Sequence, residues 1–148
     1  ADSAYGRHRL YLETYLMNKY KNVYITRLPS LFGKGLKKNV IYDLINEDYR
    51  FVPSPWSYFQ YYCLDNIWKD IQKQIDLDIK TLNINSERVP FDKVLNLFGL
   101  NLEQFRRNKV VQENMLSDHA EHWGQTGDYL YTQEEILEEI KKFITPHE

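Results

Sequence analysis

The sequence predicts an α/β protein, and three observations lead to this fold class. Segments with apolar residues at helical spacing alternate with short runs rich in β-branched and aromatic residues. Their order is helix, strand, helix, strand, helix, which is typical of an α/β protein with parallel strands. The length of 148 residues fits one domain, and a hydrophobic share of 43% is enough for one core.

The first helix is expected over residues 5–20, with Ser3 as its N-cap. Residues 23–28 follow as a strand that ends before Pro29, and both of its faces are apolar, as in a strand buried within a parallel sheet. A parallel strand after a helix completes a strand–helix–strand crossover. No strand precedes the first helix, so we expect the chain to begin in the middle of such a unit.

The next elements are short. Residues 30–39 contain two glycines and are expected to form a loop, and residues 39–46 a short helix. Residues 49–62 are expected to be extended and interrupted by two prolines. Residues 80–85 form the second strand candidate.

Three helices are expected in the remainder of the chain. Asp65 is expected to cap the helix over residues 66–75. The inward face of this helix is expected to be Ile67, Trp68, Ile71 and Ile75. Residues 90–99 have proline near the first turn and glycine past the end of a helix. The last helix begins at the capping box Thr132–Glu135, and residues 100–127 are expected to be irregular, with a helical turn near Glu103.

The amino-acid composition limits which binding partners and which cellular compartment can be expected. The net charge is −2 and the basic residues are dispersed, so we expect no nucleic-acid partner. No apolar run approaches the roughly 20 residues that span a bilayer, so no membrane association is expected. The single cysteine, Cys63, suits a reducing compartment, and a cytoplasmic location is expected.

Tyr5 and Arg9 form the pair with the clearest chemical meaning. They lie four residues apart at the start of a helix and therefore share one face. A cation beside a phenol stabilises the phenolate. A phenol so activated can exchange a proton with a substrate hydroxyl. The spacing therefore predicts acid–base chemistry, and the alternative on these residues alone is that both side chains merely decorate a helix start.

Residues 3–100 resemble the extended short-chain dehydrogenase/reductases, the NAD-dependent epimerase/dehydratase family. The places of the family's Tyr, Gly, Lys and Glu are held here by Tyr5, Gly6, Arg9 and Glu13. The segment "RLPSLFG" follows the next strand where the family has Arg, an apolar pair, Asn, an apolar residue, an aromatic and Gly. "YYCLDNIW" and "LNINSERVPFDKVLNLFG" resemble its later segments.

The resemblance implies an oxidoreductase that uses NAD or NADP on a hydroxyl or carbonyl of a sugar-like substrate. Tyr5 would be the catalytic acid–base, and Arg9 its catalytic partner and a cofactor ligand, although the family has Lys there. The other cofactor-binding residues would be Leu28 and Pro29, and the substrate-binding residues Ser30 and Asn39.

The same resemblance implies a domain organisation. Residues 1–36 would end a Rossmann-like doubly wound sheet, and residues 37–148 would be mainly a small α/β substrate-binding subdomain with terminal helices. The Gly-rich turn that holds a dinucleotide pyrophosphate is not among these 148 residues. We therefore expect this chain to be a C-terminal portion that lacks its N-terminal nucleotide-binding part. Without that part, the chain is expected to bind no cofactor. A homo-oligomer, or association with that N-terminal part, is expected because strand 23–28 has an uncovered edge.

Other functions stay open. Arg9 in place of Lys favours a non-catalytic binding or regulatory protein that retains the scaffold. An unrelated α/β domain that contacts proteins through its tyrosines is a third alternative. His119 and His122 lie beside two carboxylates, but no distant ligand group accompanies them, so no metal is expected.

Overall fold

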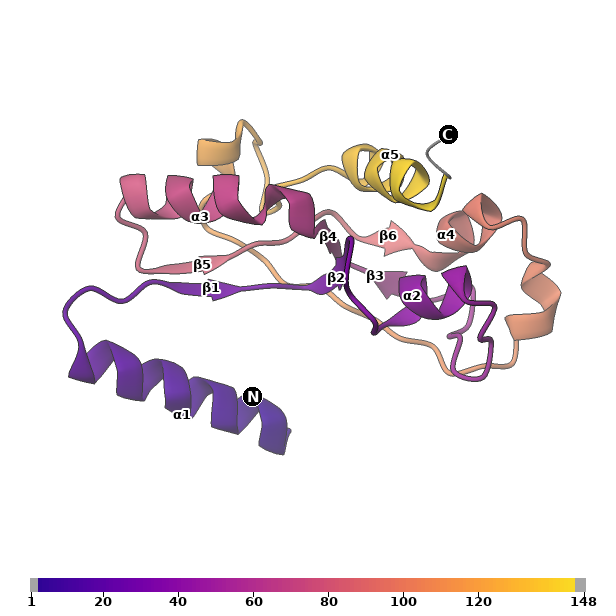
Figure 1. Ribbon diagram of the computed structural model, residues 1–148, viewed down its shortest axis with the longest axis horizontal. Coiled ribbons are helices and arrows are strands. Elements are labelled where there is room, and N and C mark those ends of the chain that lie inside the picture. The colour runs from indigo at the N-terminus through magenta and orange to yellow at the C-terminus, as the bar shows by residue number, and fades with distance from the viewer. Residues whose placement is uncertain (1–2, 146–148) are drawn as a thin grey trace.

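The computed structural model describes residues 3–145 and has a mixed α/β architecture (Figure 1). Its described helices are α1 (Ala4–Lys19), α2 (Val40–Ile45), α3 (Ile67–Asp76), α4 (Phe91–Leu97) and α5 (Gln133–Ile144). The strands are β1 (Ile25–Arg27), β2 (Ser30–Phe32), β3 (Tyr58–Phe59), β4 (Tyr61–Cys63), β5 (Thr81–Asn83) and β6 (Val89–Pro90). Short 3₁₀ turns are η1 (Leu64–Asn66), η2 (Leu102–Phe105) and η3 (Ala120–Trp123). Among these described helices, none is both long and apolar enough to cross a membrane.

The described strands pair in three two-stranded ladders. β1 runs parallel to β5, and β2 runs parallel to β4. β3 runs antiparallel to β6. Parallel partners far apart in sequence require long connections, here built from helices and loops, which confirms the predicted α/β class.

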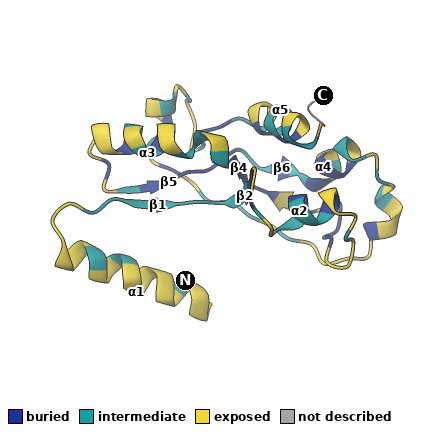
Figure 2. Cartoon of the chain, viewed as in Figure 1, coloured by how far each residue is buried: buried dark blue, intermediate teal, exposed yellow. Residues whose placement is uncertain are grey.

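Helix α1 lies on one side of the β1–β5 pair and α3 on the other (Figure 1). No residue of α1 is buried, and most of its length is exposed (Figure 2). Arg27 on β1 forms an ion pair with Glu13 on α1, with 2.5 Å between Nη2 and Oε2. β1 is only half-buried, which corrects the expectation that the faces of strand 23–28 are buried as within a parallel sheet. Within residues 3–145 only β5 pairs with it, so its other edge has no strand partner there, as expected.

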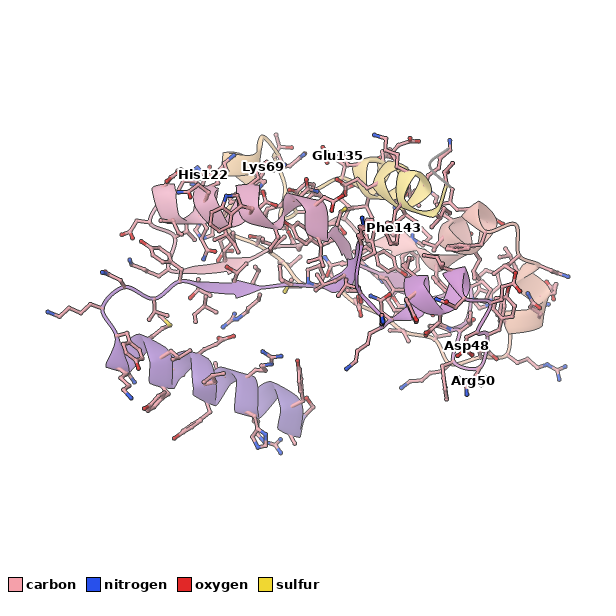
Figure 3. All side chains as sticks on the ribbon, in the orientation of Figure 1. Asp48, Arg50, Lys69, His122, Glu135 and Phe143 are labelled. Carbon is pink, nitrogen blue, oxygen red and sulfur yellow. The ribbon has the colours of Figure 1, made fainter. Side chains whose placement is uncertain are left out.

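The core lies under α4 and α5, around β4. Tyr61 and Tyr62 on β4 are fully buried. The ring of Phe143 on α5, labelled in Figure 3, lies 5.8 Å from the ring of Phe32 on β2. The predicted capping box at the start of α5 is present, and the apolar side chains of this helix pack on the core, namely Ile136, Leu137, Ile140, Phe143 and Ile144. Burial of that face stabilises α5 more than its intrinsic propensity does.

The predicted inward face of α3 is confirmed at Ile67, which packs against the core, but it is wrong at Trp68 and Ile75. Trp68 is 74% exposed and Ile75 is 41% exposed, whereas Asp70 and Gln74 are fully buried. Gln74 Nε2 donates to the carbonyl oxygens of Ile25 and Ile79, at 3.0 Å each. A polar side chain can be buried when all its hydrogen-bonding groups have partners. For Gln74 these partners lie outside α3, so the pattern within the helix could not indicate its burial.

Two local expectations are corrected as well. Asp65 does not cap α3: it lies within η1, and the N-cap position of α3 is Asn66, whose side chain makes no capping bond. Residues 30–39 are not wholly a loop, because Ser30–Phe32 forms β2 and pairs with β4. Backbone pairing and the burial of Phe32 outweigh the loop signal of the two glycines that follow.

Replacing Gly33 by alanine is expected to destabilise the fold. Gly33 has φ +151°, and an added Cβ would come within 2.9 Å of Leu64 Cβ. Gly35 is the matched control, because its φ is +89° but an added Cβ would meet nothing within 4 Å. We expect Gly35→Ala to lower the free energy of unfolding by about 1 kcal/mol, and Gly33→Ala by at least about 1 kcal/mol more. Urea unfolding measures both, and equal losses would contradict the predicted clash.

Candidate functional site

An open groove of about 710 Å³ lies between α1 and the segment that runs from β1 to β2. We call it the Tyr5 groove. Its α1 wall is Tyr5, Gly6, Arg9, Leu10 and Glu13. Its other wall is Thr26, Arg27, Leu28, Pro29 and Leu31. The structure thus brings together four of the residues that the sequence singled out, namely Tyr5, Arg9, Leu28 and Pro29.

Tyr5 and Arg9 are in direct contact. Arg9 Nε donates a hydrogen bond of 3.1 Å to Tyr5 Oη, and Arg9 Cζ lies 5.1 Å from the centre of the phenol ring. The Oγ of Ser3 accepts from the Gly6 amide at 3.0 Å, which fixes the start of the helix as predicted. Tyr5 is 69% exposed, so its hydroxyl is accessible to a ligand. The Tyr5 hydroxyl is thus held by a hydrogen bond from a basic side chain on the wall of the groove.

The same arrangement occurs a second time on α1. Lys19 Nζ donates to Tyr15 Oη at 2.8 Å and lies 5.2 Å from the Tyr15 ring centre. Tyr15 and Lys19 are not among the residues that line the Tyr5 groove. A cation four residues after a tyrosine is therefore a common helical pairing, and the groove is what distinguishes Tyr5.

Glu13 and Arg27 form the connection between the two walls of the groove. Arg27 Nε and Nη2 both donate to the Glu13 carboxylate, and Nη1 donates to Asn83 Oδ1 at 3.4 Å. The hydrogen bonds from Arg27 lower the pKa of Glu13, and the hydrogen bonds to Glu13 raise the pKa of Arg27. Both groups stay charged at neutral pH, so this bidentate pair holds α1 beside β1.

The two predicted substrate-binding residues lie elsewhere. Asn39 is the N-cap of α2: its Oδ1 accepts from the Ile41 amide at 3.0 Å, and its Nδ2 donates to the Leu31 carbonyl. Both ends of its amide are thus used within the fold, and it does not line the Tyr5 groove. Ser30 lines a neighbouring shallow hollow of about 470 Å³.

We call this second space the Glu113 hollow. Its lining residues are Leu28, Pro29, Ser30, Gln60, Glu113, Asn114 and Met115. Glu113 Oε2 accepts a hydrogen bond of 3.1 Å from the backbone N–H of Gln60, and Oε1 accepts one of 3.5 Å from Ser30 Oγ. Burial raises the pKa of Glu113.

Glu113 had no signal in the sequence. The segment around it belongs to the region expected to be irregular, and it is held beside β3 by backbone bonds. Tyr58 N donates to Val111 O at 2.9 Å, and Glu113 N donates to Tyr58 O at 3.0 Å. This pairing, between segments more than 50 residues apart in sequence, helps to bring Glu113 to Ser30.

The histidine pair forms a different kind of contact. The rings of His119 and His122 stack with centres 6.2 Å apart, and His122 Nε2 lies 3.7 Å from Glu121 Oε1. In the described residues 3–145, no group of three or more His, Cys, Asp or Glu side chains could hold a metal ion. These contacts point to a surface turn.

Comparison of the sequence with protein-family models, with curated proteins and with solved structures finds no match. The function is therefore inferred from the residues and from their geometry.

Proposed function

We propose that this chain is the substrate-side portion of an NAD(P)-dependent epimerase/dehydratase-like oxidoreductase that acts on a sugar-like hydroxyl or carbonyl group. The observation that carries the proposal is the Tyr5–Arg9 hydrogen bond on the wall of a groove that also includes Leu28 and Pro29. The parallel pairing of β1 with β5 is compatible with the Rossmann-like sheet that the resemblance implies.

In this proposal the proton moves at Tyr5 Oη. The Arg9 guanidinium donates to this oxygen and stabilises the phenolate that remains when the proton has left. A substrate hydroxyl in the groove would give its proton to the phenolate during oxidation, and a carbonyl would receive it during reduction. The Glu13–Arg27 ion pair connects the two walls of the groove.

In this proposal the groove would take the nicotinamide end of the cofactor. Arg9, Leu28 and Pro29 would meet the ribose and nicotinamide end, and the bound cofactor would supply hydride transfer. No Gly-x-Gly-x-x-Gly sequence for the pyrophosphate is present among the 148 residues. We therefore propose that these residues alone do not hold the cofactor.

A second candidate function is a non-catalytic binding or regulatory protein on the same scaffold. The observation that favours it is the guanidinium at position 9, because a planar fork does not reproduce the contacts of a compact ammonium. In that case the groove would bind a ligand without turnover.

Arg9→Lys distinguishes the two candidates. In the protein as encoded, assayed by nicotinamide reduction with a panel of sugars, we expect the lysine variant to turn over several-fold faster than the wild type. The reason is that a compact ammonium can approach both the phenol and a ribose hydroxyl. Lys19→Arg on the same helix is the control and should leave the rate unchanged. Absence of turnover in both wild type and Arg9→Lys would favour the non-catalytic candidate.

The proposal includes self-association or association with a nucleotide-binding part. Helix α1 exposes large apolar side chains. They are Tyr5, Leu10, Tyr11, Leu12, Tyr15 and Met17. Large apolar side chains left exposed along a helix are typical of surfaces that bind a protein partner.

A further inference from the structure

The Tyr5 groove and the Glu113 hollow are adjacent. Leu28 and Pro29 line both spaces, so the two hollows meet at this dipeptide. A ligand whose reacting carbon lies near Tyr5 could extend across Leu28 and Pro29 toward Glu113. The second hollow is then the place where the remainder of such a ligand would be recognised.

The two spaces differ in charge. The Tyr5 groove contains Arg9 and the Glu13–Arg27 ion pair. Among the described residues that line the Glu113 hollow, Glu113 is the charged one, and its neighbours Ser30, Gln60 and Asn114 are neutral and polar. A phosphate or carboxylate placed there would face a carboxylate with no lining cation to offset the repulsion.

Glu113 has capacity for a ligand. A carboxylate offers about four lone-pair sites. One of them accepts a hydrogen bond from the backbone N–H of Gln60, and another accepts one from Ser30 Oγ at the long distance of 3.5 Å. Burial is the largest cause that raises the pKa of Glu113, so a ligand that donates hydrogen bonds to this carboxylate would stabilise its charged form.

We infer that the Glu113 hollow is a specificity site, which accepts hydroxyl or amino groups of a sugar-like ligand and excludes phosphate and carboxylate groups. A ligand O–H or N⁺–H donates to the Glu113 carboxylate, and Ser30 Oγ and the Asn114 side chain provide further polar contacts. The inference rests on the proposed function only in taking the ligand to be sugar-like.

Amide NMR titrations of the chain with glucosamine, glucose and gluconate test this inference, because these six-carbon polyhydroxy compounds are cationic, neutral and anionic respectively. We expect glucosamine to shift the amide signals of Ser30, Gln60 and Asn114, and to bind roughly tenfold or more tighter than gluconate. Glucose should shift the same signals with intermediate affinity. Equal binding of glucosamine and gluconate, or shifts confined to other residues, would overturn the inference.

Variants sharpen the test. Glu113→Gln should remove the preference for glucosamine, and Glu113→Lys should reverse it in favour of gluconate. Glu138→Gln, which changes an exposed carboxylate on α5, should leave the preference unchanged. If Glu113→Gln keeps the full preference, the inference fails. If the variants at position 113 do not fold, the wild-type comparison of glucosamine with gluconate decides.

The outcome can be separated from that of the proposed function. Selective shifts around Glu113 in a protein without turnover would sustain the binding site and refute the reaction. Turnover that depends on Tyr5 would support the proposed reaction. If gluconate then bound at the Glu113 hollow as tightly as glucosamine, the inferred selection by charge would be refuted.

Discussion

Asp70→Ala is expected to lower the free energy of unfolding by about 3–5 kcal/mol. Asp70 is fully buried on α3 and accepts three side-chain hydrogen bonds. Tyr62 Oη donates at 2.6 Å, Tyr131 Oη at 2.5 Å and Trp123 Nε1 at 2.9 Å. Alanine would leave these donors without an acceptor in the interior and would also open a small cavity.

The donors come from separate parts of the chain, which is why the effect is large. Tyr62 lies on β4, Trp123 on η3, and Tyr131 just before α5, so one carboxylate connects α3 with three other segments. Burial, followed by the hydrogen bond to Asp70, raises the pKa of both Tyr62 and Tyr131. Both phenols therefore remain protonated donors at neutral pH.

Urea unfolding followed by circular dichroism measures this prediction. Asp76→Ala is the matched control, because Asp76 ends the same helix, is exposed, and accepts one bond from Gln72. We expect the control to change stability by less than about 0.5 kcal/mol. The loss in unfolding free energy for Asp70→Asn should lie between those of Asp70→Ala and Asp76→Ala. The asparagine oxygen still accepts a hydrogen bond, whereas its NH₂ group would face hydrogen-bond donors. A loss at Asp70→Ala as small as that of the control would show that the three bonds do not stabilise the fold.

Asp70 also explains where the sequence was informative and where it was not. The start of α1 and the capping box of α5 depend on residues three apart, and both were predicted correctly. The buried face of α3 depends on Tyr62, Trp123 and Tyr131, which no local pattern connects to Asp70. An apolar stripe is therefore a reliable guide to burial only where no polar side chain finds distant partners.

The candidate site follows the same division. The Tyr5–Arg9 contact joins residues that are four positions apart on one helix, so it could be predicted from their spacing alone. The two walls of the Tyr5 groove come from consecutive elements, so Leu28 and Pro29 could be placed near Tyr5 as well. Glu113 could not, because it lies 83 positions after Ser30 in a segment expected to be irregular, and no local pattern connects the two residues. The structure also assigns Asn39 a capping role that its position in a glycine-rich segment did not indicate.

Tyr5→Phe is expected to reduce turnover of the protein as encoded by roughly 100- to 10,000-fold, with little change in KM. Phenylalanine keeps the ring against Arg9 but removes the oxygen that accepts from Arg9 Nε and carries the proton. Tyr15→Phe is a closely matched control, because Tyr15 has the same cation contact on the same helix and does not line the groove. We expect its turnover to stay within about twofold of the wild type, since it removes only an exposed hydrogen bond.

The comparison of these two variants separates chemistry from helix stability. Both substitutions remove one tyrosine hydroxyl and one hydrogen bond to a basic side chain from α1, so their effects on the helix should be similar. Any additional loss at position 5 then reports on the groove, where Leu28 and Pro29 form the opposite wall. Equal turnover of Tyr5→Phe and Tyr15→Phe would mean that the phenol of Tyr5 moves no proton, and the groove would then be a binding surface only.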